Sequence, residues 1–240
     1  MRYRAIHNNA HQQCAMRPAP VLPQEMCEAL WNSQDLSPYT PKGLQSRMAF
    51  SLTSTSSHLR PGQDLYHLTV DCFKVRKIKA TDRGSHGMVG WDALIVDPHV
   101  NKTYSGGTVP KSRKTTLQVM TFALDPAWIN ESRYAELLTR HPLWLYNKLM
   151  EKRPLVTKKT NHFFLDALST ATVSGVQRKA IERDPVDGWA RVPTWYADST
   201  LGIDSLLHIL KDAVNAMDPA KVRELWNLEP DEDIPSVTGY

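Results

Sequence analysis

This 240-residue sequence contains three runs of basic side chains whose type and spacing are suited to binding a ligand. Lysines and arginines that converge on one surface bind phosphate groups. A tyrosine and several glycines lie among the runs, and an aromatic ring can stack on a base while glycine lets a backbone approach closely. The candidate nucleic-acid-binding residues are Lys74, Arg76, Lys77, Lys79, Arg83, Tyr104, Lys111, Arg113, Lys114, Lys152, Arg153, Lys158 and Lys159.

The charge is unevenly distributed along the chain, although the net charge of the whole is only +4. Residues 71–160 carry 16 basic and 8 acidic side chains, whereas residues 161–240 carry 7 basic and 13 acidic ones. Such asymmetry bears on partners rather than on fold. It predicts a nucleic-acid partner for the basic middle, RNA more than DNA. It also permits self-association or contact with other protein subunits, because opposite patches can join head to tail.

A second interpretation of the basic runs needs no ligand at all. Charged side chains on an edge strand prevent sheets from pairing edge to edge, and an ordinary solvated face is often basic. In an extended chain Lys74 and Arg76 project to one face while Lys77 and Lys79 project to the other. This pattern predicts that the run lies at a sheet edge.

His162 is the one candidate for catalysis, because it follows the Lys158-Lys159 pair and could act as a general acid or base beside a bound phosphate. Its alternative role is a polar residue ahead of an apolar segment. Cys14, Cys27 and Cys72 are too widely spaced for a zinc site and are expected to be free thiols. No phosphate-loop or dinucleotide-binding signature is present, so we expect neither a cofactor nor a metal.

The elements that must position these residues indicate an α+β fold. We expect an antiparallel β-sheet core at about residues 46–124, followed by helices, all within a single domain at 46–228. Residues 1–45 form an irregular, proline-rich arm with one short helix from Gln24 to Trp31, and residues 229–240 form an acidic tail.

The sheet is expected to hold four to six strands. Met48, Phe50 and Leu52 alternate with small polar residues, and residues 65–74 alternate in the same way. Residues 91–96 are expected to form a hairpin with residues 102–104, and residues 115–124 supply a further strand.

Helical periodicity follows residue 126. Asn130 or Ser132 can cap a helix that runs to Arg140, and Pro142 opens the next helix. The clearest amphipathic helix covers residues 203–214, and Asp218-Pro219 predicts the start of a last one.

These patterns favour a non-enzymatic, nucleic-acid-binding subunit of a nucleoprotein assembly, with RNA the expected ligand. Two alternatives remain open: a self-assembling structural protein of the matrix or shell type, and a metal-independent RNA-processing endonuclease that uses a histidine. The polar start of the chain and the lack of a long apolar stretch predict neither a signal peptide nor a transmembrane segment, hence a cytoplasmic, intracellular location.

Overall fold

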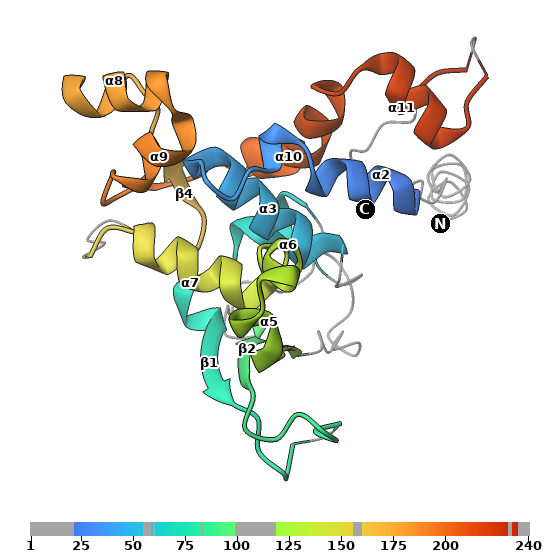
Figure 1. The fold of residues 1–240 in the computed structure, drawn as a ribbon, viewed down its shortest axis with the longest axis vertical. Coiled ribbons are helices and arrows are strands. Elements are labelled where there is room, and N and C mark those ends of the chain that lie inside the picture. Colours follow the sequence, from blue (N-terminus) through green and yellow to red (C-terminus); the bar gives the residue numbers. More distant parts are fainter. Residues whose placement is uncertain are drawn as a thin grey trace, which may run out of the picture.

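A computed structural model describes residues 22–54, 59, 61–82, 84–98, 119–155, 160–229 and 232–234. Helices and small antiparallel sheets alternate along the chain, which confirms the α+β class (Figure 1). The helices are α2 (Gln24–Trp31), α3 (Pro41–Ser54), α4 (Gln63–Tyr66), α5 (Pro126–Asn130), α6 (Ala135–Leu138), α7 (Pro142–Lys152), α8 (Gly175–Arg183), α9 (Pro185–Ala190), α10 (Ile203–Asn215) and α11 (Pro219–Trp226). Short 3-10 turns cover Gln34–Leu36, Val70–Cys72 and Ser132–Tyr134.

Two antiparallel sheets organise the strands. The first has the order β1 (Phe73–Lys77), β2 (Asp92–Val96) and β3 (Met120–Leu124), and the second pairs β4 (Leu165–Ala167) with β5 (Tyr196–Thr200). Helix α7 packs on β2 and β3. Stacked rings of Phe73, Tyr146 and Phe163 join the first sheet to this helix and to the segment before β4, with ring centroids of Phe73 and Phe163 4.1 Å apart.

Helix α3 is the centre of the core. Leu44, Met48, Phe50 and Leu52 have no exposed surface, and polar residues on the remaining sides of the helix are buried as well. A helix that is enclosed on all sides has no solvent-facing stripe, so its sequence lacks the 3.6-residue apolar period. For this reason the alternation of Met48, Phe50 and Leu52 wrongly predicted a strand.

The expected strand at residues 65–74 is also wrong for most of its length. Helix α4 and the 3-10 turn Val70–Cys72 occupy it, and only β1 at its end is extended. Between them, Thr69 forms an isolated antiparallel bridge with His162. Strand β2 confirms the strand predicted at residues 91–96, and β3 confirms the end of the strand predicted at residues 115–124. Strand β2 pairs with β1 and β3. Residues 102–104, the expected hairpin partner of β2, lie outside the described ranges.

Helix boundaries follow local capping chemistry. Helix α2 has the predicted bounds, α7 begins at Pro142, and α11 begins at Pro219 with the Asp218 side chain accepting a hydrogen bond from the Ala220 amide. The helix expected to run from Asn130 or Ser132 to Arg140 is replaced by a 3-10 turn and the short helix α6, and α5 precedes it. Helices α8 and α9 were not predicted, although Ser174 with Gln177 forms a capping box and Asp184 caps the helix that Pro185 opens.

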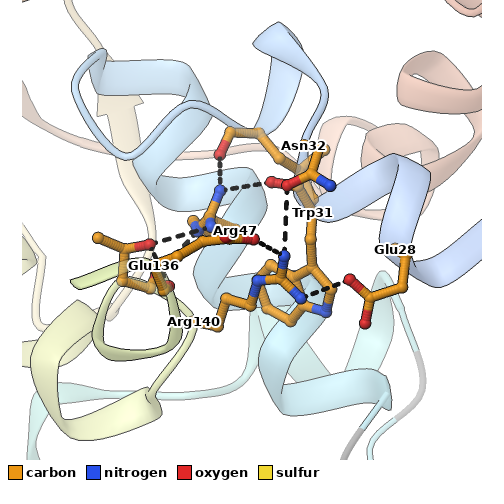
Figure 2. A network of polar contacts seen from close by, with 8 residues as sticks. Glu28, Trp31, Asn32, Arg47, Glu136 and Arg140 are labelled. Carbon is orange, nitrogen blue, oxygen red and sulfur yellow. Dashed lines mark hydrogen bonds and ion pairs between the residues drawn. The ribbon is translucent and has the colours of Figure 1, made fainter. Parts of the chain in front are cut away.

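A buried arginine on α3 ties three parts of the helical body together (Figure 2). The Arg47 guanidinium donates hydrogen bonds of 2.8 Å to each of the main-chain carbonyls of Trp31, Leu36 and Thr139. A further bond of 3.2 Å reaches the Thr139 hydroxyl. Burial, together with the nearby Arg140, lowers the pKa of Arg47 to about 10. The residue therefore stays charged at neutral pH and holds the ends of α2 and α6 against α3.

Arg140 completes this network beside Trp31. The Arg47 guanidinium carbon lies 5.0 Å from the Trp31 ring centroid and that of Arg140 lies 5.8 Å away, both within the range of cation–π attraction. Arg140 also pairs with Glu28 at 2.6 Å and with Glu136. The two carboxylates supply the negative charge that two neighbouring arginines require.

Replacement of Arg47 by methionine is expected to lower the free energy of unfolding by about 3 kcal/mol or more, because it leaves three buried or partly buried carbonyls without this donor. Urea denaturation of the variant and the unchanged protein measures the difference. Arg133→Met is the control, since Arg133 is an exposed arginine with one ion pair to Glu131, and it should cost less than about 1 kcal/mol. An equal loss in the two variants would contradict a special role for Arg47.

Candidate nucleic-acid interface

The first basic run lies on an exposed strand at the edge of the first sheet, as the sequence predicts. Strand β1 pairs only with β2 among the described strands, and four of its five residues are exposed: Lys74, Val75, Arg76 and Lys77. Strand β1 and the loop that leads to β2 extend away from the helical body, as Figure 1 shows at the bottom of the view. The basic side chains thus lie where a large ligand can reach them.

Strand register assigns the basic side chains to two faces. Lys74 and Arg76 stand opposite Ile95 and Ala93 of β2, whereas Lys77 stands opposite Asp92, on the other face. Lys79 follows the strand and is exposed as well. The run therefore presents positive charge to both faces of one edge.

Two of these four cations already have carboxylate partners. Arg76 forms two hydrogen bonds to Asp82, of 2.6 and 3.1 Å, and Asp82 also accepts one of 2.7 Å from the Lys79 amide. The hydrogen bond from Arg76, followed by that from the Lys79 amide, holds the pKa of Asp82 below its ordinary value. Lys77 pairs with Asp92 at 3.1 Å.

Lys74 and Lys79 form no ion pair with any residue that the structure describes. The sequence runs suggested a dense positive cluster, and the counter-charges Asp82 and Asp92 were missed because they lie outside the basic run that they neutralise. The unpaired positive charge of this part of the hairpin is therefore smaller than the sequence suggests, and it is carried by two lysines.

A groove of about 500 Å³ lies beside Arg76, between the β1–β2 loop and β3. Ile78, Met88 and Val119 supply apolar walls, and Arg76, Asp82 and Thr121 supply polar ones. The loop keeps its shape through tight turns that need glycine: Gly84 and Gly90 have φ values of 78° and 86°. No sequence pattern indicated this groove, because it joins residues far apart in the chain.

Lys152 and Arg153 are removed from the candidate interface by their burial. Lys152 is 6% exposed and donates to the carbonyls of Ala190 and Val192 at 3.2 and 3.1 Å. Arg153 is 8% exposed and donates to the carbonyls of Phe163 and His162 at 2.8 and 2.6 Å. Both residues hold separate segments of the chain together, and neither has its charged group free for phosphate.

His162 is also committed to the fold. Its ring Nδ1 lies 2.7 Å from the Tyr66 carbonyl, which can only accept, so this nitrogen carries the proton. Its ring centroid lies 4.9 Å from that of Tyr66. The expected role beside a bound phosphate depended on Lys158 and Lys159, which lie outside the described residues. The contacts of His162 agree with the structural alternative.

Five other candidate residues also lie outside the described ranges: Arg83, Tyr104, Lys111, Arg113 and Lys114. The structure thus places the first basic run and removes Lys152 and Arg153. Within the described ranges, no group of three or more histidine, cysteine, aspartate or glutamate side chains could hold a metal ion. Over the same ranges, no helix has both the length and the apolar character that a membrane crossing requires.

Comparisons of the chain with protein-family models, with curated protein sequences and with solved structures find no match. The function is therefore argued from the arrangement of the side chains alone.

His141 anchors the basic sheet to the helical body. Its Nε2 donates to the Ala123 carbonyl of β3 at 3.0 Å, and its Nδ1 accepts a bond of 3.1 Å from the Leu143 amide at the start of α7. Only the neutral ring can make both bonds, since a protonated ring has no acceptor. Burial lowers the pKa of His141 below its ordinary value, against the opposing effect of the bond to Ala123.

Protonation of His141 should therefore destabilise the fold as the pH falls. The unfolded chain binds this proton near pH 6.5, whereas the folded chain binds it only at lower pH, so stability is full above about pH 6.5 and declines below it. His141→Asn keeps a capping side chain and removes the titration. Urea denaturation at about pH 7.5 and pH 5.5 should show a smaller loss in this variant than in the unchanged protein. If His141→Asn lost as much stability as the unchanged protein, the role given to His141 would be refuted. His86→Asn, which replaces an exposed histidine, is the control.

Proposed function

We propose that this protein binds nucleic acid, with RNA favoured, through strand β1 and the loop that follows it, as a subunit of a nucleoprotein assembly. The observation that carries the proposal is the exposed edge strand with Lys74 and Arg76 on one face and Lys77 on the other, and with exposed Lys79 shortly beyond its end. Positive side chains at this spacing neutralise neighbouring phosphates and release their counterions.

The ion pairs on the strand are compatible with this role. Arg76 with Asp82 and Lys77 with Asp92 are solvent-exposed pairs, and such pairs contribute little to stability, so a phosphate can replace the carboxylate at small cost. Lys74 and Lys79 then provide the first contacts and the arginine a later, bidentate one.

The groove beside Arg76 favours single-stranded RNA over a regular duplex. Specific contacts to RNA are made mostly to unpaired bases, which can turn out of the strand into a pocket. A groove of about 500 Å³ with apolar walls at Ile78, Met88 and Val119 is of a size to receive one base while the lysines contact the backbone.

A cytoplasmic location is part of the proposal. Cys27 and Cys72 form no disulfide, as a reducing compartment favours.

The charge on β1 opposes self-assembly through this strand. Two copies paired along this edge would bring the lysines and arginine of one strand against those of the other, and like charges directly opposite are destabilising. The RNA-cleaving alternative is not proposed here, because Lys158 and Lys159, on which it depended, lie outside the described residues.

The double variant Lys74→Ala/Lys79→Ala should bind single-stranded RNA more weakly and with less salt dependence. Loss of two phosphate contacts lowers the slope of log binding constant against log salt by about 1.4 on a single strand. Fluorescence anisotropy with labelled RNA and DNA at several salt concentrations measures the slope.

The matched control is Lys179→Ala/Arg183→Ala on α8, which removes the same charge from a helix far from the hairpin in Figure 1. Its slope should equal that of the unchanged protein. Equal slopes in all three proteins, or no binding by the unchanged protein at low micromolar concentration and low salt, would end the proposal.

Asp82→Asn should strengthen binding. The substitution removes a negative charge and releases Arg76 from its ion pair, while the asparagine oxygen can still accept from the Lys79 amide. The salt slope should rise by about 0.7, as one additional phosphate contact predicts. Asp187→Asn, at an exposed aspartate on α9, is the control for a general gain of positive charge. A response equal to that control would show that Arg76 makes no contact with the ligand.

A further inference from the structure

A second pocket lies in the helical body, apart from the basic hairpin. It occupies about 420 Å³ between the start of α3, the residues around β4 and helix α10. In Figure 1 these elements lie toward the top of the view, and β1 lies at the bottom. Nothing in the proposed nucleic-acid interface involves this pocket.

Two buried polar side chains line the pocket with hydrogen-bonding capacity unused. Ser46 is 3% exposed, and its hydroxyl has no hydrogen-bond partner among the residues that the structure describes. Gln45 is equally buried and donates its amide nitrogen to the Leu165 carbonyl at 2.5 Å. That bond fixes the amide and leaves its oxygen without a described donor. Both residues line the open pocket, so a ligand bound there can pair with them in place of water.

Two carboxylates add further acceptors. Asp166 receives a bond of 2.6 Å from the Ser199 hydroxyl on one oxygen and has its other oxygen free of described donors. Asp212 on α10 lines the same pocket and forms no ion pair with a described residue. Lys42 supplies the one positive charge among the lining residues. Acceptors and negative charge therefore predominate.

The remaining walls are aliphatic. Leu168, Leu201 and Ile209 line the pocket, together with the small side chains of Ala167, Ser169 and Ser205. A ligand complementary to these walls has a short hydrocarbon chain and a head with several N–H donors. An ammonium or guanidinium group on an alkyl chain meets both requirements, because it is positively charged and donates without accepting.

We propose that this pocket binds an alkylammonium or alkylguanidinium group, with Asp166 and Asp212 neutralising the cation and Ser46 and Gln45 accepting its hydrogen bonds. The group could belong to a free polyamine or to an arginine side chain within a peptide, since the head chemistry is the same. The binding does not depend on nucleic acid.

The test uses the full chain and three cationic probes: agmatine, spermidine and an arginine residue blocked at both ends. Inorganic phosphate is the anionic probe. Chemical-shift changes of the Ser46, Leu168 and Ser205 amides locate binding, and their titration gives the affinity. Binding of agmatine and spermidine alone identifies a free amine as the ligand, whereas equal binding of the blocked arginine identifies a peptide side chain.

Substitutions give the sign of the charge that the pocket prefers. Asp212→Asn should weaken binding of the cationic probes about fivefold, as loss of one solvent-accessible ion pair predicts, and Lys42→Met should strengthen it. Ser46→Ala should weaken binding without a change of charge. Asp204→Asn is the matched control, because Asp204 lies on α10 but does not line the pocket.

Three outcomes would overturn the proposal. The first is that no cationic probe shifts the pocket amides at millimolar concentration. The second is that Lys42→Met weakens binding, or that phosphate is the probe that binds, which would identify an anion site. The third is that Asp204→Asn has the same effect as Asp212→Asn, which would show a general effect of charge rather than a site.

Discussion

The fold depends on one charged group in a place where charge is costly. Arg47 lies on the most enclosed of the described helices, and its guanidinium is stabilised there by carbonyls at the end of α2, in the turn after it and in the turn after α6. Main-chain carbonyls are orphaned at helix ends, and this arginine satisfies them from the inside of the core. The position of α2, and with it the first described part of the chain, is fixed by these bonds rather than by apolar packing alone.

Buried cations recur in this fold with the same purpose. Lys152 and Arg153 at the end of α7 also donate to main-chain carbonyls, and in doing so they bring α9 and the segment before β4 to the helix. The molecule thus uses its basic residues in two ways. Some bind carbonyls where connecting segments meet, and others are displayed on β1, where carboxylates neutralise part of their charge.

Local signals in the sequence predicted local structure well. Pro142, the Asp218-Pro219 pair and the apolar period of residues 203–214 each led to a helix that the structure contains, because caps and amphipathic stripes act within a few residues. Ser174 and Asp184 are helix caps of the same kind, although the helices that they begin were not predicted. The edge position of the basic run was also predictable, since only an edge tolerates charge on both faces.

Long-range contacts were not predictable in the same way. The alternation at Met48, Phe50 and Leu52 could be distinguished from a strand only with knowledge of what surrounds α3. The roles of Lys152 and Arg153 could not be separated from those of Lys74 and Lys79 by residue type, because burial decided between them. The groove beside Arg76 and the pocket beside Ser46 each combine residues from distant parts of the chain.

The burial of Lys152 and Arg153 has a consequence for the chemical reactivity of the chain. Trypsin cleaves after an accessible lysine, here between Lys152 and Arg153 but not before Pro154, and a free lysine amine reacts with acylating reagents. Here the Lys152 amine is held between two carbonyls and lies 5.1 Å from the centre of the Trp195 ring. The native protein should therefore resist both reactions at Lys152, while Lys74 and Lys79 remain open to them, so cleavage between Lys152 and Arg153 reports on the opening of the core.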